Sequence, residues 1–430
     1  MRLDSPKTTK MTTQVTTQNM PGQEVSTPSV AAAPSRTRAA RTLALTGLNH
    51  ALHDGFTDTI YVLLPIWQTE FALSYSVVAI FRGLYSGAMA CLQIPAGHLA
   101  ERIDAKLILC CGTVLSALGY AFAGLSGGVI GLSLALALAG AGSSTQHPLA
   151  SAAISRAYGR AARRPLGIYN FTGDLGKAAI PAAMSLLLVS FAWRHAVFAL
   201  AAVAIAVSIA MAVWMPAVGK QHAADPTQRS SQAHQGQGGF YWLLAIGMLD
   251  SAVRMGFLTF LPFLPIDKGA TLPTRGLALA LVFIGGAAGK FACGWLGERV
   301  GTRRTVLFTE IATAVLILGV LMLPLVPAIV LLPALGVMLN GTSSVLYGTV
   351  PELTPPHRTE RAFALFYTGT IGAGAGAPVL YGVLGDAFGP MTATTATAIT
   401  ALAICPFMIA LSRHLGSDAE VETETPASQR

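Results

Sequence analysis

The chain has 430 residues, of which 53% are hydrophobic and only 11% are charged, and its mean hydropathy is positive. Ordinary soluble domains carry roughly a quarter charged residues, so this composition excludes a soluble globular protein and is typical of an integral membrane protein. The net charge of +8 comes from basic residues scattered along the chain. That scatter argues against nucleic acid as a partner.

The polar segments divide the chain into parts. Residues 1–40 are rich in Thr, Ser, Pro and Gln, and we expect a disordered cytoplasmic tail there rather than a cleavable signal peptide. An apolar stretch at 41–216 is followed by a polar linker at 217–239 and a second apolar stretch at 240–413. The acidic residues 414–430 are expected to form a second disordered cytoplasmic tail.

Each apolar stretch contains six windows long enough to cross a bilayer, whose core of about 30 Å needs about 20 apolar residues per helix. The windows lie at 43–66, 75–98, 106–126, 129–153, 166–189, 195–215, 241–264, 275–297, 304–324, 327–350, 361–384 and 389–411. The chain is therefore expected to be an all-α integral membrane protein with twelve transmembrane helices in two six-helix bundles.

The basic residues predict the orientation of these helices. Most of the 28 Lys and Arg residues lie in the N-terminal tail, in the linker and in alternate loops, all on one side of the predicted bilayer. The loops of the opposite side hold Arg194, Lys268 and Arg275. By the positive-inside rule the basic side, which includes both termini, is cytoplasmic.

The first predicted helix carries four ionisable side chains in the stretch LNHALHDGFTD. His50, Asp54 and Asp58 recur every fourth residue and form a stripe, with His53 one step to the side. A charged side chain at mid-depth in a bilayer costs roughly 2.5 to 3.5 kcal/mol, so these residues are candidates for function. Because histidines and buried carboxylates can exchange protons near neutral pH, we predict proton coupling at all four. The alternative is that they hydrogen-bond to other helices and fix the packing.

Two further pairs of opposite charge lie within single predicted helices. Asp174 and Lys177 are three residues apart, and Asp250 and Arg254 are four apart. Each pair lies on one helix face and could neutralise itself locally. A role in a substrate cavity is the other interpretation for these four side chains.

Arg82 has no partner on its own predicted helix. It is expected to reach Asp54 or Asp58, or an anionic substrate, because a guanidinium pairs with two oxygens at once. Lys290 is likewise unpaired on its helix, and Glu310 adds a further carboxylate at membrane depth.

Polar residues precede a proline in the fourth predicted helix, in the stretch GSSTQHP. Pro148 frees a carbonyl one turn back and tends to kink a helix, which lets neighbouring polar groups line a cavity. The tenth predicted helix offers a similar stretch, NGTSS, beginning at Asn340. We predict that Gln146, His147 and Asn340 line a cavity, although Ser and Thr in such stretches can also bond their own helix backbone.

The two apolar stretches repeat each other at an offset of 197 positions. The matching residues are Pro65 and Pro262, Gly97 and Gly294, Glu101 and Glu298, Arg102 and Arg299, Arg164 and Arg361, and Pro181 and Pro378. A parallel repeat predicts two bundles related by a pseudo-two-fold axis along the membrane normal. Such bundles enclose a cavity that rocking exposes to either side.

The repeat is sharpest in two short loops, GHLAERIDAK at 97–106 and GWLGERVGTRR at 294–304. These loops resemble the G-x-L-A-D-R-x-G-R-K motif of the major facilitator superfamily, although Asp104 stands where the motif has glycine. Their charges could bridge helices in one conformation and release them in the other, or simply anchor the loops in the cytoplasm. The residues predicted for this cytoplasmic gate are Gly97, Glu101, Arg102, Gly294, Glu298, Arg299 and Arg303.

Within that superfamily the chain is most similar to the fosmidomycin-resistance-like exporters. The similarity lies in the first helix, LNHALHDGFTDTIYVLLPIWQTEFALSYSVV, and around the fourth, GAGSSTQHPLASAAISRAYGRAARRPLGIYNFTGDLGK. It implies the major facilitator fold, in which the first, fourth, seventh and tenth helices surround the substrate path. It also implies a monomeric, proton-driven efflux pump of the bacterial inner membrane that works by alternating access.

The substrate of this expected transporter is a small organic compound or drug, with an anion favoured by the basic side chains. The residues predicted for its cavity are Arg82, Gln146, His147, Asp174, Lys177, Asp250, Arg254 and Asn340. The stretch GIYNFTGDLGKAAIP matches the glycine-proline motif of drug antiporters poorly. Proton-driven uptake of a small organic anion therefore stays open, and so does a non-transporting sensor that keeps the carrier fold.

An enzyme is the main rival class. His53 and Asp58 have an H-x4-D spacing that occurs in acyltransferases, and His50, His53 and Asp54 could ligate a metal ion. No soluble catalytic domain accompanies them, so we expect no enzymatic activity, no cofactor and no metal. The expected partners are a small-molecule substrate, protons and the lipid bilayer.

Overall fold

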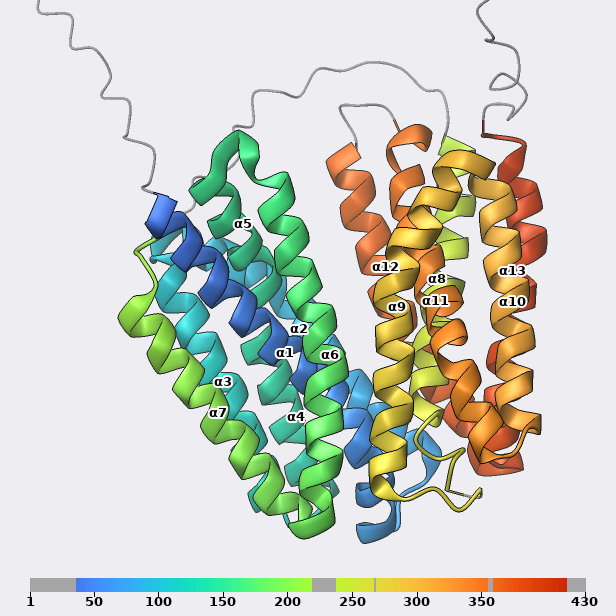
Figure 1. The fold of residues 1–430 in the computed structure, drawn as a ribbon, viewed down its shortest axis with the longest axis horizontal. Helices are drawn as coiled ribbons and strands as arrows, with labels where there is room; N and C mark the ends of the chain where they lie inside the picture. The colour runs from blue at the N-terminus through green and yellow to red at the C-terminus, as the bar shows by residue number, and fades with distance from the viewer. Residues whose placement is uncertain (1–35, 219–236, 267, 355–358, 416–430) are drawn as a thin grey trace, which may run out of the picture.

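The structure is a computed structural model that describes residues 36–218, 237–266, 268–354 and 359–415 (Figure 1). The predicted tails, apart from residues 36–40 and 414–415, and most of the predicted linker lie outside these ranges. Within them the secondary structure is helical, with no strand. The predicted all-α fold class is confirmed.

The N-terminal half contains helices on both sides of a short 3-10 turn. They are α1 (Arg36–Glu70), α2 (Tyr75–Arg102), α3 (Ala105–Leu125), α4 (Val129–Ser143), α5 (Gln146–Tyr158), η1 (Gly159–Ala161), α6 (Arg163–Ser190) and α7 (Trp193–Trp214). The C-terminal half contains α8 (Gln237–Phe260), α9 (Leu272–Val300), α10 (Thr302–Met322), α11 (Leu325–Thr349), η3 (Pro351–Leu353), α12 (Thr359–Phe388) and α13 (Pro390–Ser412).

Eleven helical segments in the described part of the chain are long and apolar enough to cross a membrane. Helix α1 is not among them, because its polar stripe lowers its hydropathy, but its 35 residues exceed the length that a bilayer requires. It begins at Arg36, ahead of the predicted start. Large apolar side chains such as Leu134, Val213 and Met322 are exposed, as contact with lipid requires.

The fourth predicted helix is divided in two. Helix α4 ends at Ser143 and α5 begins at Gln146, so the kink expected from Pro148 is a break that lies just before the proline. Pro148 itself falls in the first turn of α5, where a missing N–H costs no helical hydrogen bond. The polar side chains at the end of α4 and the start of α5 therefore lie in the middle of the bundle.

The structure reproduces the internal repeat. Helices α9, α10 and α13 begin 197 residues after α2, α3 and α7, respectively. The two bundles meet mainly along two helix pairs that this repeat makes equivalent, α2 with α12 and α6 with α9. At the second pair a Cβ on Gly276 would overlap the side chain of Ser185, so the absence of a side chain there allows the helices to approach closely.

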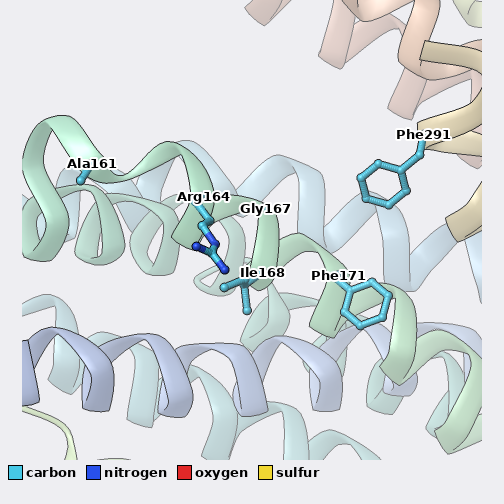
Figure 2. Close-up of a pocket in the computed structure, with 6 residues that line it drawn as sticks. All are labelled: Ala161, Arg164, Gly167, Ile168, Phe171 and Phe291. Atoms are coloured by element: carbon cyan, nitrogen blue, oxygen red, sulfur yellow. The ribbon is translucent and has the colours of Figure 1, made fainter. Parts of the chain in front are cut away.

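The bundles separate towards one end of the molecule, the end that carries the start of α1 and the end of α13 (Figure 1). A cleft of ≈ 700 Å³ lies there, lined by Arg164, Ile168 and Phe171 of α6 and by Phe291 of α9. Figure 2 shows Phe171 and Phe291 on its two walls. The molecule is therefore open at the end where α1 begins and α13 ends.

Candidate functional site

The ionisable stripe of α1 lies inside the protein. Asp54 and Asp58 are 7% and 5% exposed, and His50 is 4% exposed. Helix α1 packs along α6 and also contacts α5. These side chains therefore face the protein interior rather than lipid.

Asp54 is the centre of a charged network that joins three helices. Its Oδ2 lies 3.4 Å from His50 Nε2 and 3.4 Å from Lys177 Nζ of α6, and its Oδ1 lies 3.6 Å from His147 Nε2 of α5. The side chains of Lys177 and His147 are 31% and 42% exposed, against 10% for Asp54. The carboxylate is thus buried beneath basic groups that solvent can reach.

His50 is held in one orientation. Its Nδ1 lies 2.8 Å from the carbonyl oxygen of Tyr169, and its ring stacks on the Tyr169 ring at 4.0 Å. A carbonyl can only accept, so Nδ1 carries the hydrogen and Nε2 points towards Asp54. A Cβ on Gly173 would lie 2.5 Å from His50 Cε1 and 2.6 Å from Asp54 Oδ2. The glycine therefore makes room for the network.

His53 points away from this network and into the N-terminal bundle. Its Nδ1 is 2.9 Å from Ser143 Oγ and its Nε2 is 3.1 Å from Thr113 Oγ1. Thr113 also donates to Asn49, which donates in turn to Gln146 at 2.6 Å. His53 and Gln146 thus belong to an interior hydrogen-bond network, and Gln146 does not line the cleft in this conformation.

Arg82 reaches across to α1, as the sequence predicted. Its Nη2 lies 3.8 Å from Asp58 Oδ1, and both side chains are buried. The guanidinium also lies over the ring of Tyr61, 5.0 Å from its centroid, and contacts Ser86. The Tyr61 hydroxyl approaches Met255 Sδ of α8 at 3.5 Å. This pair therefore lies next to a contact between the bundles.

Asp174 and Lys177 do not pair with each other, so the local neutralisation considered for them is wrong. Asp174 instead accepts a hydrogen bond from Lys290 Nζ of α9 at 2.6 Å, while Lys177 turns to Asp54. The cause is that α1 and α9, which flank α6, each offer a closer partner. The Asp174–Lys290 ion pair joins the two bundles.

The second local pair forms as expected. Arg254 Nη2 lies 3.8 Å from Asp250 Oδ2, and Arg254 Nη1 donates to Ser343 of α11 at 3.2 Å. Asn340 is half-buried and donates to the Gly336 carbonyl of its own helix at 3.1 Å. A Cβ on Gly286 would meet its side chain, so Asn340 packs against α9.

The predicted gate residues lie at the open end of the molecule, but mostly not in loops as expected: they lie in the last turns of α2 and α9 and the first turn of α10, because these helices continue almost to the next helix. Glu101, Arg102, Glu298, Arg299 and Arg303 are exposed, and none forms an ion pair with another described residue. Arg299 lies over the ring of Trp295. A Cβ on Gly97 or Gly294 would meet no atom within 4 Å. The latch stays a prediction for the conformation in which this end is closed.

Three residues of the site could approach a metal ion together. Ligand atoms of His50, Asp54 and His147 lie within 4.8 Å of one another. His53 is not part of this group, because it turns to Ser143 and Thr113. The ammonium of Lys177 already provides the Asp54 carboxylate with a positive charge. The expectation of no metal therefore stays a prediction.

Sequence reasoning named Lys177 but missed Tyr169 and Gly173, which belong to the same part of the site on α6. Tyr169, Gly173 and Lys177 follow one another at four-residue intervals and form the face of α6 that meets His50 and Asp54. That spacing matches the stripe on α1 and could have been recognised. The hydrogen-bond partners of His53, namely Thr113 and Ser143, carried no comparable signal.

A family model described as Major Facilitator Superfamily matches residues 46–246 and again residues 243–429. The fosmidomycin resistance protein of Escherichia coli (strain K12) is 27% identical over 157 residues, which cover 36% of this chain and 39% of that protein. The chain therefore matches less than half the length of this relative. Human monocarboxylate transporter 11 is 25% identical over 378 residues, covering 83% of this chain and 78% of that protein.

Solved structures of transporters resemble this chain over most of its length. A bacterial homolog of the human lysosomal transporter Spinster, in an inward-facing and occupied conformation, aligns with a TM-score of 0.77 at 18% identity, over 90% of this chain and 100% of that one. The nucleoside transporter NupG aligns with a TM-score of 0.71 at 13% identity, over 87% and 99%. At these identities the likeness concerns the fold alone.

Proposed function

The chain belongs to the major facilitator superfamily, and from this premise we propose that it is a secondary active transporter that moves a small organic anion by alternating access, coupled to protons. The family membership favours transport over the enzyme considered above. We place it in a bacterial inner membrane as a monomer with cytoplasmic termini, so that the cleft lined by Phe171 and Phe291 faces the cytoplasm.

The observation that carries the proposal is a set of partly exposed basic side chains on α5, α6 and α9, each paired with a less exposed carboxylate. Lys177 and His147 share Asp54, and Lys290, which is 38% exposed, pairs with Asp174. An anion that enters from the open end meets the basic groups first. Charge-assisted hydrogen bonds to them would hold a carboxylate or phosphonate group. We therefore propose Lys177, Lys290 and His147 as substrate ligands.

Proton coupling follows from the competition for these basic groups. When an anion draws Lys177 away, the Asp54 carboxylate loses its nearest full positive charge at a buried position. A carboxylate in that situation binds a proton more tightly. His50 and His147 lie on either side of it to deliver the proton. We assign the proton-binding role to Asp54 and His50, with Asp58 beside Arg82 as a second carrier and His53 as a hydrogen-bonded relay.

Two directions of transport are supported by different observations. Efflux, the first candidate, is supported by the local similarity to the fosmidomycin resistance protein. Uptake is the second candidate. Because an anion at Lys177 favours protonation of Asp54, anion and proton bind together, which suits movement of both in one direction. The longer match to monocarboxylate transporter 11 supports a carboxylate as the transported anion.

The test is flux into proteoliposomes under an imposed pH gradient, with radiolabelled fosmidomycin and radiolabelled lactate as probes. The intact protein is compared with Asp54→Asn and with Glu352→Gln, a control that alters an exposed carboxyl on η3. We expect gradient-driven flux of at least one probe, lost in Asp54→Asn and kept in the control. Unchanged gradient dependence in Asp54→Asn would remove the proton role of α1. The sign of the gradient that drives accumulation distinguishes efflux from uptake.

A further inference from the structure

Two imidazoles converge on one carboxylate where α1 meets α5. His50 Nε2 lies 3.4 Å from Asp54 Oδ2, and His147 Nε2 lies 3.6 Å from Asp54 Oδ1. The two imidazole rings meet edge to face, with their centroids 5.0 Å apart. One ligand atom of each residue lies within 4.8 Å of those of the other two. Three potential metal ligands are thus gathered about one point.

His50 has a buried nitrogen whose bonding capacity is unused. Its Nδ1 donates to the Tyr169 carbonyl oxygen at 2.8 Å, so in the neutral ring Nε2 carries a lone pair. This Nε2 has no hydrogen-bond partner in the described structure. It faces a carboxylate oxygen of Asp54, which is also an acceptor. A proton or a metal cation bound by both atoms would make this contact favourable.

The distances suit a transition-metal ion. Such an ion binds nitrogen and oxygen at about 2.0–2.2 Å, so two ligands of a tetrahedral site lie roughly 3.4 Å apart. The two histidine–carboxylate distances are 3.4 and 3.6 Å. The side chain of His147 is 42% exposed, which makes it the ligand most able to adjust its position. A metal-ligating histidine almost always donates its other N–H to a carbonyl or carboxylate, as His50 does to Tyr169.

The donor set indicates which ions would bind. Two imidazole nitrogens and one carboxylate favour Zn²⁺, Co²⁺ or Ni²⁺. Mg²⁺ and Ca²⁺ are disfavoured, because they prefer a shell of oxygen ligands. Three protein ligands leave a fourth position of a tetrahedral ion for water or an anion. The partial exposure of His147 shows that solvent reaches the group.

Lys177 is the group that opposes a metal ion here. Its Nζ lies 3.4 Å from Asp54 Oδ2, so an ion bound to that carboxylate would meet its positive charge. The side chain of Lys177 is 31% exposed and has a flexible four-carbon stem, which lets the ammonium swing towards solvent. Metal ion and ammonium therefore compete for Asp54. This competition weakens metal binding without abolishing it.

We propose that His50, Asp54 and His147 form a binding site for a divalent transition-metal ion of the zinc class, which displaces Lys177 from Asp54 and joins α1 to α5. The proposal replaces the expectation of no metal. The sequence considered His53 as the third ligand, whereas the structure turns His53 away and brings in His147 from another helix. Because the ion occupies groups that the proposed function assigns to the proton and the substrate, it also inhibits transport. That consequence rests on the proposed function, whereas the site itself does not.

The direct test is calorimetric titration of Zn²⁺ into the purified full-length protein. The five cysteines are first replaced by alanine and any histidine tag is removed, because both bind the same ion. We expect one ion per chain. His147→Ala and Asp54→Asn each remove a ligand and should weaken binding by about tenfold or more. Lys177→Gln removes the competing ammonium and should tighten it. His195→Ala, at an exposed histidine of α7, is the control and should change nothing.

Co²⁺ provides a second measurement, since a tetrahedral Co²⁺ site absorbs visible light far more strongly than the hydrated ion. The intact protein should show this absorption and His147→Ala should lose it. Absence of Zn²⁺ binding, or binding that neither His147→Ala nor Asp54→Asn weakens, would overturn the site. Unchanged affinity in Lys177→Gln would refute the displacement of the ammonium.

Inhibition is tested separately in proteoliposomes. Zn²⁺ is expected to reduce the gradient-driven flux of a probe that the intact protein moves, Mg²⁺ to leave it unchanged, and a chelator to restore it. Full flux at a Zn²⁺ concentration that saturates the site would refute the inhibition. If the intact protein moves neither probe, the proposed function fails, while the titration still decides whether the site binds a metal ion.

Discussion

Asp386, near the end of α12, caps the first turn of α2: its Oδ1 accepts a hydrogen bond from the Tyr75 backbone N–H at 2.5 Å, and its Oδ2 accepts one from Ser76 at 3.2 Å. The first N–H groups of a helix have no partner within that helix, and a carboxylate there also interacts favourably with the helix dipole. Because α2 and α12 belong to different bundles, this cap ties the bundles together at their closed end.

Removing the cap is therefore expected to favour the conformation that opens at that end. Loss of an N-cap costs about 0.5–2 kcal/mol, which corresponds to a change of up to roughly 30-fold in the ratio of the two conformations. The measurement is the distance between spin labels at Phe191→Cys and Phe388→Cys, both exposed at this end, in a background without other cysteines. Asp386→Ala should populate longer distances.

Glu70→Gln is the matched control for this experiment. Glu70 lies at the same end but binds Arg194 and Trp193 within its own bundle. It should leave the distance distribution as in the parent. If both variants shift the distances equally, the effect is not specific to the contact between bundles.

Gly173 is predicted to be essential for the geometry around Asp54. Gly173→Ala inserts a Cβ 2.5 Å from His50 Cε1, and overpacking of this kind typically costs about 1–3 kcal/mol. Gly167→Ala on the same helix meets no atom within 4 Å, so it should be neutral or stabilise α6 by up to about 1 kcal/mol. Thermal unfolding in one detergent compares the two. Equal melting temperatures would show that the side chains around Gly173 shift to accept the added Cβ without loss of stability.

The gate loops are predicted to matter only when the open end closes. Gly294→Leu fills empty space in this conformation, so the thermal stability should stay close to that of the parent. If the loops approach one another during the cycle, the added side chain obstructs closure and flux falls. Gly127→Leu, in a loop where a Cβ likewise meets no atom within 4 Å, is the control. Full flux in Gly294→Leu would argue that the loop motif only anchors the chain.

The ion pair between Asp174 and Lys290 is predicted to respond to charge reversal. Each single reversal, Asp174→Lys or Lys290→Asp, places like charges together between α6 and α9 and should reduce flux. The double variant restores opposite charges and should recover part of it. A partly exposed pair contributes about 0.2–1 kcal/mol, so the recovery should shrink at high salt. A double variant no better than the single ones would exclude a functional pairing.

The architecture could be predicted from the sequence because the length of the apolar segments and the 197-residue offset of the repeat both depend on local composition. Arg82 was also predictable, since a guanidinium without a partner on its own helix has to find a carboxylate on another. Its partner Asp58 was one of the two proposed. The break before Pro148 was expected only as a kink, because sequence alone does not show where a helix resumes.

The pairing of Asp174, Lys177 and Lys290 was beyond sequence reasoning. Spacing within a helix shows which side chains share a face, but the choice of partner depends on which helices flank that face. Helix α6 lies between α1 and α9, so its two charges separate towards different neighbours.

The two equivalent seams, α2 with α12 and α6 with α9, have a mechanical consequence. Any rocking of the bundles has to pivot on these lines of contact. Long interlocking side chains along them would obstruct the motion. The seams instead bring small residues against main chain: a Cβ on Gly83 would lie 3.1 Å from the Ala375 carbonyl oxygen. Close contact without interlocking side chains along these two helix pairs is thus a requirement as strict as the chemistry of the charges between them.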